Sequence, residues 1–335
     1  MIAAANEAGD GVYLRAYLSP LADVLARPDV TDIYVNRPGE LWIETLGGLT
    51  ERHEAPQLDE TMLWRLARQI AALSHQGISR EHPLLSATLP DGARVQIVAP
   101  PATRGPLAFA IRKHVEQDLC LSDYVASGAL GDVTIQRHLG QREGDDALRA
   151  QLDRGDVAGM LAAAVRGRRN ILVSGGTSTG KTTFLNALIR EIPAEERLVF
   201  IEDTPELQLR HANALGLIAA RSRLGESEVT TDDLVAASLR MRPDRIILGE
   251  LRGQEAYAFL RAVNTGHPGS MTTVHADSAE RAVEQIALLV LQGGTRLGRE
   301  DVHFYVQRTI DVFVQLSRSG GRRRVTQVVL NEAAA

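Results

Sequence analysis

Apolar positions in the N-terminal third of the chain follow two different periods. Residues 13–26 and 59–76 carry apolar side chains at the 3.6-residue spacing of a helix, and Asp59 stands where an N-cap is expected. Other segments are short, alternating or apolar, and are bounded by turn residues, which is typical of strands. The predicted strands are residues 31–36, 41–44, 94–98 and 107–112. A small mixed α+β unit is therefore expected here.

From residue 169 onward, short apolar runs alternate with helical patterns. Strands are predicted at residues 171–173, 198–201, 245–248 and 271–274, and helices at 181–190, 231–241, 254–263 and around 283–290. Alternation at this spacing indicates a mostly parallel sheet with helices on both faces. The chain is thus expected to be an α/β protein, with a small mixed α+β N-terminal domain followed by a second domain on a mostly parallel sheet.

A polar, glycine-containing stretch of mixed charge separates the two patterns. We expect an N-terminal domain over residues 1–130, a linker with some helix over 131–155 and a C-terminal domain over 156–335. The alternative is a surface excursion of one larger domain. Near the C-terminus, the basic run Arg322–Arg324 is expected to be a solvated hairpin turn, or else a contact with lipid or a partner.

Composition narrows the class of protein. The 335 residues are 44% hydrophobic and 24% charged, which is ordinary for a folded domain and excludes disorder for the bulk. No apolar run reaches the roughly 18 residues of a bilayer span, the N-terminus lacks a secretory pattern, and Cys120 has no second cysteine to pair with. These features predict a cytoplasmic protein. A net charge of −5 and 4% aromatic residues disfavour dedicated nucleic-acid binding.

One glycine-rich segment matches a phosphate-binding motif without a mismatch. Residues 175–182 read GGTSTGKT, which fits G-x4-G-K-[ST], between a predicted strand and a predicted helix. In such a loop successive N–H groups point at phosphate oxygens, and the helix adds the positive end of its dipole. The motif predicts ATP and Mg²⁺ as cofactors. The expected binding residues are Gly175, Gly176, Thr177, Ser178, Thr179, Gly180, Lys181 for the β and γ phosphates, Thr182 for Mg²⁺, and Thr183.

Polar residues also follow three predicted strands. Glu202 and Asp203 follow residues 198–201, Glu250 follows 245–248, and His275 follows 271–274. The carboxyl ends of parallel strands are where open α/β sheets bind ligands, and acidic groups there can hold Mg²⁺ or orient water. Any one acid could instead cap the next helix. His275 taken alone could be a polar core histidine or a phosphate sensor.

Four segments together resemble the hexameric secretion ATPases. The runs SGGTSTGKTT, ERLVFIEDTPEL, LRMRPDRIILGELRG and TGHPGSMTTVHAD look like the Walker A motif, aspartate box, atypical Walker B and histidine box of that superfamily. The likeness is greatest to the traffic ATPases of type IV secretion and covers about the whole chain. The resemblance implies a RecA-like P-loop domain. It is looser in the N-terminal runs PLLSATLPDGARVQIVAPP and FAIRKH.

The same resemblance implies roles for individual residues. Glu202 would be the base that polarises water, Glu250 would hold Mg²⁺ through water, and His275 would sense the γ-phosphate, alongside the catalytic Lys181. Arg94 in GARVQ and Arg112 in IRKH look like arginines that approach the nucleotide, although Arg94 could equally be an exposed strand residue without a ligand. His267 matches the pattern too, but its glycine and proline neighbours favour a role in a turn.

The implied function is a ring ATPase that powers type IV secretion, in substrate transfer, pilus assembly or both. The resemblance implies a homo-hexamer, inner-membrane channel components as partners, and peripheral association with the cytoplasmic face of the bacterial inner membrane. A type IV pilus retraction or assembly ATPase remains the alternative. A type II assembly ATPase usually carries a four-cysteine zinc insertion, whereas this chain has one cysteine. Two other classes, a DNA motor and a nucleotide-gated docking module, are disfavoured.

Overall fold

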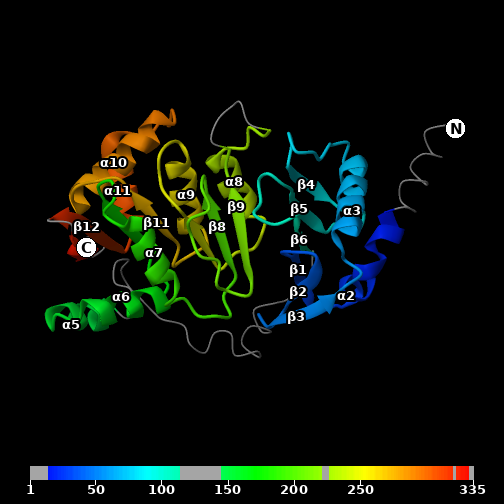
Figure 1. The fold of residues 1–335 in the computed structure, drawn as a ribbon, viewed down its shortest axis with the longest axis horizontal. Helices are drawn as coiled ribbons and strands as arrows, with labels where there is room; N and C mark the ends of the chain where they lie inside the picture. The colour runs from blue at the N-terminus through cyan, green and yellow to red at the C-terminus, as the bar shows by residue number, and fades with distance from the viewer. Residues whose placement is uncertain (1–13, 114–144, 221–225, 320–321, 332–335) are drawn as a thin grey trace, which may run out of the picture.

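The computed structural model describes residues 14–113, 145–220, 226–319 and 322–331. Two sheets lie side by side in Figure 1, one built from the N-terminal part of the chain and one from the C-terminal part. We refer to them as the N-terminal sheet and the C-terminal sheet. None of the helices in the described ranges is long and apolar enough to span a bilayer.

The N-terminal sheet has six strands in the order β3-β2-β1-β6-β5-β4, each antiparallel to its neighbour. Its strands are β1 (Val30–Val35), β2 (Gly39–Thr45), β3 (Thr50–Ala55), β4 (Leu84–Thr88), β5 (Arg94–Val98) and β6 (Ala108–Arg112). The predicted strands are confirmed, and β3 and β4 are additional. The described part of the predicted first helix is interrupted by the 3₁₀ turn η1 (Ser19–Leu21), which precedes α2 (Ala22–Ala26).

One amphipathic helix covers this sheet. α3 (Glu60–Leu73) buries Leu63, Leu66 and Ile70 in a core shared with β1, β5 and β6. The predicted N-cap of α3 is confirmed: the Asp59 side chain accepts a hydrogen bond of 2.7 Å from the Met62 amide.

The C-terminal sheet has seven strands in the order β13-β12-β7-β11-β10-β8-β9. They are β7 (Ile171–Gly175), β8 (Leu198–Glu202), β9 (Ala214–Ile218), β10 (Arg245–Leu248), β11 (Met271–Val274), β12 (Val312–Ser319) and β13 (Arg322–Leu330). Every neighbouring pair is parallel except β12 and β13. The predicted mostly parallel sheet is confirmed, and β9, β12 and β13 are additional.

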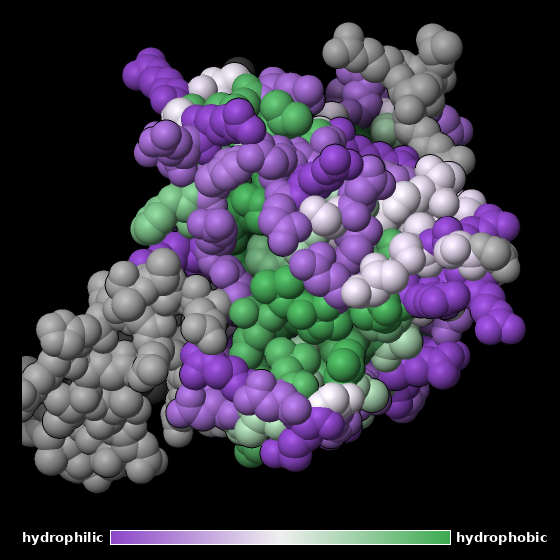
Figure 2. All heavy atoms as spheres, turned by 90° about the vertical axis from the view of Figure 1, so that its left-hand side faces the viewer, coloured by the Kyte–Doolittle hydropathy of each residue, from purple (hydrophilic) through white to green (hydrophobic). Residues whose placement is uncertain are grey.

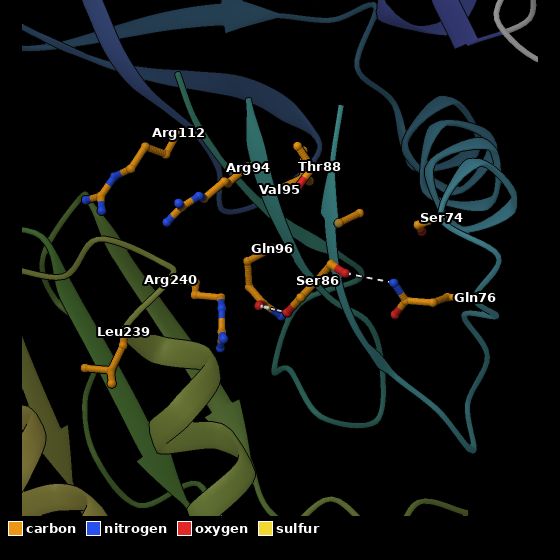
Figure 3. A pocket seen from close by; sticks show the side chains of 11 residues that line it. Ser74, Gln76, Ser86, Thr88, Arg94, Val95, Gln96, Arg112, Leu239 and Arg240 are labelled. Atoms are coloured by element: carbon orange, nitrogen blue, oxygen red, sulfur yellow. Dashed lines mark hydrogen bonds between the residues drawn. The ribbon is translucent and has the colours of Figure 1, made fainter. Parts of the chain in front are cut away.

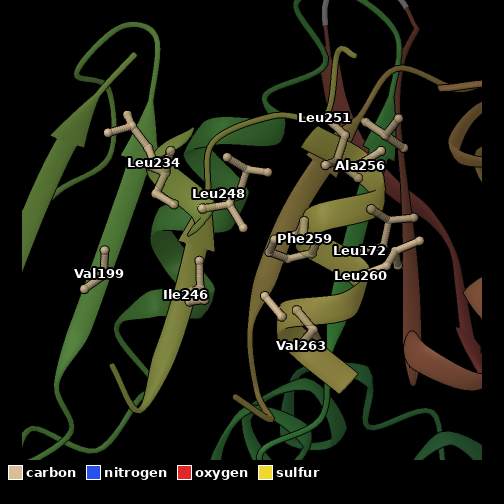
Figure 4. Packing of buried hydrophobic residues seen from close by; sticks show 14 of the residues in the cluster. Leu172, Val199, Leu234, Ile246, Leu248, Leu251, Ala256, Phe259, Leu260 and Val263 are labelled. Atoms are coloured by element: carbon tan, nitrogen blue, oxygen red, sulfur yellow. The ribbon is translucent and has the colours of Figure 1, made fainter. Parts of the chain in front are cut away.

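Helices cover both faces of the C-terminal sheet. One face carries α5 (Asp145–Asp153), α6 (Val157–Arg166) and α7 (Lys181–Ile189), and the other carries α8 (Thr231–Ser238), α9 (Glu255–Asn264), α10 (Ala279–Gln292) and α11 (Arg299–Thr309). Figure 4 shows Phe259, Leu260 and Val263 of α9 packed over the strands. Alternate residues of each strand enter one core or the other, which is why the strands are apolar throughout. Because β7 to β12 run parallel, their carboxyl ends lie along one rim of the sheet.

The predicted linker lies only partly within the described ranges. Its residues 131–144 are outside them, and the rest includes α5 and the loop before α6. A helix in this region agrees with the expected helical content, while the boundaries at residues 130 and 156 stay a prediction.

A loop of the N-terminal domain pairs with the outer strand of the C-terminal sheet. The Arg104 amide donates to the Gly216 carbonyl, and the Ile218 amide donates to the Ala102 carbonyl, each at 2.9 Å. Thr103 forms an antiparallel bridge with Leu217 between them. Residues 102–104 thus act as a short extra strand along β9 and cover that edge.

A second contact joins the two domains through a buried cation. The guanidinium of Arg197 lies 3.9 Å from the ring centre of Tyr34 and donates at 2.8 Å to the side chain of Asn36. The amide of Asn36 donates at 3.0 Å to Asn213. These polar groups are buried, so they hold the domains in one specific arrangement.

The basic run near the C-terminus is not in a turn as expected. Arg322, Arg323 and Arg324 begin β13 and pair with Ser319, Arg318 and Ser317 of β12. They are exposed, as predicted, but the antiparallel ladder extends through them. The predicted turn is too late in the sequence. Gly320-Gly321, directly before the run, is itself a hairpin signal and was not used.

Candidate active site

The glycine-rich loop joins β7 to α7, as the motif predicts. Gly180 has a φ of +91° at the N-cap of α7, a left-handed conformation that glycine adopts without strain. Gly175 has no room for a side chain, since a Cβ there would lie 2.5 Å from the Thr179 hydroxyl. That hydroxyl donates to the Gly176 carbonyl at 2.9 Å. The loop is therefore curled tightly before the helix begins.

Lys181 lies folded against this loop. Its ammonium donates to the carbonyls of Gly175 at 3.0 Å and Gly176 at 3.2 Å, and lies 3.4 Å from both ring nitrogens of His275. Burial lowers the pKa of Lys181, and Arg252 lowers it further, while Glu250 opposes the shift. The lysine thus lies beside the loop with no hydrogen bond to a carboxylate in the described ranges, which suits a group that binds phosphate.

Glu250 and His275 meet at the ends of β10 and β11. His275 Nε2 lies 2.8 Å from Glu250 Oε1, and Arg252 donates at 2.9 Å to Glu250 Oε2. Oε1 is buried and has no well-aligned hydrogen bond within the described residues, because the contact with His275 is close but poorly directed. Arg252 also pairs with Asp203 at the end of β8. Glu250 and His275, both predicted from the sequence, are therefore brought together beside Lys181, and Asp203 is joined to them through Arg252.

The donor set fits a magnesium ion. A carboxylate oxygen without a well-aligned partner lies near the P-loop, and the Thr182 hydroxyl is on the first turn of α7, only half-buried. Hard oxygen donors of this kind, completed by water and phosphate, are what Mg²⁺ prefers.

Both carboxylate oxygens of Glu202 are engaged, and the residue is 4% exposed. Its Oε1 accepts from the amides of Glu206 at 2.9 Å and Leu207 at 2.7 Å, and its Oε2 pairs with the guanidinium of Arg104. The arginine also donates at 3.0 Å to the Leu207 carbonyl. Glu202 is thus locked between its own following loop and the N-terminal domain.

Sequence reasoning missed Arg104. Its stem lies across Gly216 of β9, where a Cβ would come within 2.6 Å of the arginine Cδ, and burial lowers the pKa of the guanidinium. The segment PATRGP matches no phosphate-binding or catalytic motif. Arg104 lies between the two N-terminal runs that resemble the family, and its only signal is its place shortly after Pro100-Pro101.

The structure does not bring Arg94 and Arg112 to the P-loop of the same chain. Figure 3 shows them extending from β5 and β6 toward Leu239 and Arg240, which follow α8, and all four line one pocket. α8 runs back from the carboxyl rim of the sheet, so its end lies toward the amino end of β10. Arg112 donates to Asp32 at 3.0 Å. Their contact with nucleotide stays a prediction.

His267 occupies the turn after α9. Its Nδ1 lies 3.0 Å from the Ala262 carbonyl, and its own carbonyl accepts at 2.7 Å from the Ser270 hydroxyl. Burial lowers its pKa. These contacts agree with the expected role in the turn.

Comparison with known proteins identifies the family. Residues 16–319 match the model for type II/IV secretion system proteins. The chain belongs to this family. It is 38% identical over 326 residues to the type IV secretion system protein VirB11 of Bartonella henselae, covering 93% of this chain and 91% of that protein. It is 39% identical over 320 residues to PtlH of Bordetella pertussis, a type IV secretion system protein, covering 93% of each chain.

A solved relative has the same fold. The crystal structure of the VirB11 ATPase from the Brucella suis type IV secretion system, in complex with sulphate, superimposes with a TM-score of 0.90 at 36% identity over 96% of each chain. The resemblance to secretion ATPases and the fold class drawn from the sequence are both confirmed. These relatives are type IV secretion system proteins, and the solved one is an ATPase.

Proposed function

We propose that this protein hydrolyses ATP at its P-loop and that the reaction powers type IV secretion. One observation carries the proposal: the curled P-loop lies beside the Lys181–Glu250–His275 cluster at the carboxyl rim of a parallel sheet. The relatives described above are type IV secretion proteins, and the solved one is an ATPase. Phosphoryl transfer depends mainly on positioning and charge, which this arrangement provides.

Each residue has a distinct task in the proposed reaction. The amides of residues 175–183 cradle the phosphates, and Lys181 exchanges its carbonyl partners for phosphate oxygens. Thr182 and Glu250, the latter through water, would hold Mg²⁺, which neutralises charge on the phosphates when bound. His275 lies where it can report the γ-phosphate to Glu250. The positive groups stabilise charge that builds up in the transition state.

Glu202 is the proposed base, and its surroundings impose a condition. Both of its oxygens are engaged by the amides of Glu206 and Leu207 and by Arg104. A base must come within hydrogen-bond reach of the water that it activates. Release of one of these donors would free a carboxylate oxygen for the water, and Arg104 is the donor that belongs to a different domain.

The proposed assembly is a homo-hexameric ring. Heterologous contacts between identical chains form a ring when they close and a filament when they do not. Because Arg94 and Arg112 lie away from the P-loop of their own chain, they would reach nucleotide only after a domain movement or from a neighbouring subunit. We also propose peripheral association with the cytoplasmic face of the inner membrane, through partner components of the secretion channel.

A pilus retraction or assembly ATPase is the alternative function. The relatives described above favour secretion, since their names place them in type IV secretion systems. Deleting the gene and measuring both substrate transfer and pilus retraction separates the two functions. Loss of retraction with normal transfer would contradict the secretion proposal.

The enzymatic part is tested by ATP hydrolysis and ATP binding with purified variants. Lys181→Ala should abolish hydrolysis and weaken binding, whereas Arg190→Ala, an exposed change at the end of the same helix, should change neither. Glu202→Gln should keep ATP affinity and lower turnover by about 10²–10⁴-fold, because base catalysis acts in the transition state. Glu250→Gln should raise the Mg²⁺ concentration needed. Parental turnover in Lys181→Ala would refute the proposal.

A further inference from the structure

The β12–β13 hairpin extends past the start of the P-loop. β12 lies beside β7, with Leu316 opposite Gly175. Residues 317–319 therefore continue beyond the end of β7, on the side where the loop curls, and β13 returns from there with Arg323 directly opposite Arg318. Paired residues of an antiparallel ladder point to the same face. The two arginines thus form a cross-strand pair next to the loop.

Both side chains reach the P-loop. Arg318 lines a pocket together with Gly176, Thr177 and Thr179. Arg323 lies over Gly180, where a Cβ would come within 3.1 Å of the arginine Cδ and 3.7 Å of Nε and Nη1. The absence of a side chain at Gly180 thus leaves room for this guanidinium as well as allowing the turn of the backbone.

The two arginines of the pair form no ion pair in the described ranges. Asp277 lines the same pocket as Arg318, but its ion pair is with Arg281, at 3.2 Å. Among the described residues, no carboxylate lies within ion-pair distance of Arg318 or Arg323. Like charges directly opposite each other destabilise a ladder. By contrast, Arg104 and Arg252 each have an acidic partner, Glu202 and Glu250 respectively. An anion placed between the hairpin and the loop would remove this repulsion.

We infer that Arg318 and Arg323 bind the phosphate chain of the nucleotide that the P-loop holds. The hairpin is then a cationic wall of the site, opposite the amides of the loop. The planar guanidinium forms paired hydrogen bonds to phosphate oxygens, which lysine does not. This inference rests on the proposed function, and it adds a wall of the nucleotide site contributed by the C-terminal strands.

The same strand supplies the control. Successive residues of a strand point to opposite faces, so Arg324 faces away from Arg323. It carries the same charge and is also exposed, and its cross-strand neighbour is Ser317. Arg324→Gln therefore makes the same change in net charge without touching the pair.

The test is equilibrium binding of a non-hydrolysable ATP analogue with Mg²⁺, in the full chain. Arg318→Gln and Arg323→Gln should each raise the Kd by about tenfold or more, since a charge-assisted hydrogen bond is lost. Arg324→Gln should change the Kd by less than about twofold. The melting temperature without nucleotide should not fall in Arg323→Gln, because repulsion is removed.

The outcomes distinguish failure of this inference from failure of the proposed ATPase. A Kd within twofold of the parent in both pair variants overturns the inference, as does an equal loss in Arg324→Gln, which would indicate a general effect of charge. Lys181→Ala is measured alongside. If it loses binding while the pair variants keep it, the inference fails and the proposed ATPase stands. If Lys181→Ala binds as the parent does, the proposed function itself fails.

Discussion

Replacing Arg104 with alanine should destabilise the fold measurably through Glu202. Removing one partner of a fully buried ion pair costs about 3–5 kcal/mol, because the other charge is left unpaired. Here the loss should be smaller, about 1–3 kcal/mol, since Glu202 keeps two backbone donors and the arginine side chain is 22% exposed, so that water can replace it. The carboxylate itself has a side-chain exposure of only 3%.

Urea unfolding of the full chain, followed by circular dichroism, measures this loss. A cycle of Arg104→Ala, Glu202→Gln and the double variant isolates the coupling between the two side chains, which should exceed about 1 kcal/mol. Arg166→Ala is the matched control. Its ion pair with Glu191 is at the surface, with side chains 64% and 38% exposed, so its removal should cost about 0–1 kcal/mol.

Two results would refute this reasoning. One is a loss in Arg104→Ala no larger than that in Arg166→Ala. The other is additivity of Arg104→Ala and Glu202→Gln within about 0.5 kcal/mol, which is the behaviour of independent sites. Either result would mean that the contact between the domain loop and Glu202 does not hold in solution.

Three further predictions concern the stability of the fold. Asp59→Ala should cost about 1 kcal/mol in urea unfolding because α3 loses its N-cap, and Asp59→Asn should restore most of it. Arg245→Met should cost about 3–5 kcal/mol, since Glu196 loses two 2.7 Å bonds in a site where the arginine is 0% exposed; a cost below 1 kcal/mol would contradict this. Burial lowers the pKa of His267 in the folded chain. As the pH falls below about 6.5, the unfolded chain therefore binds the proton before the folded chain does, and the free energy of unfolding decreases. His267→Gln should reduce the slope of the melting temperature between pH 6.5 and about 5, and an unchanged slope would exclude this histidine as a source.

The sequence predicted best those features that depend on local patterns. The P-loop and the polar residues after β8, β10 and β11 could be placed because strand ends in a parallel sheet share one rim. Lys181, Glu250 and His275 do meet there. The cap of α3 was predictable for the same reason, since it involves residues three apart.

Features that depend on distant contacts were not predictable from the sequence. Arg104 lies 98 residues before Glu202, and their contact exists only because the loop pairs with β9. No periodicity in the segment before β6 signals that pairing. The position of Arg94 and Arg112 likewise depends on how the two domains pack, which no motif in either domain specifies.

The hairpin was missed for a different reason. Gly320-Gly321 is a recognised hairpin signal, whereas the sequence analysis expected the turn at Arg322–Arg324; the second strand, RRRVTQVVL, has no period-two alternation that would mark it as a strand. The register of β12 against β7 then decides which of the arginines approach the loop. That register is a property of the assembled sheet.

The two outer strands of the C-terminal sheet differ in how they are protected from self-association. Residues 102–104 cover β9, whereas no described strand pairs with the outer side of β13. Figure 2 looks onto the side of the molecule where β13 lies in Figure 1, and apolar side chains gather in the middle of that face. An uncovered edge strand is a template for aggregation, and charge on the strand opposes it. The arginines of β13 therefore also act as gatekeepers of solubility, so their neutral variants should be handled at low protein concentration.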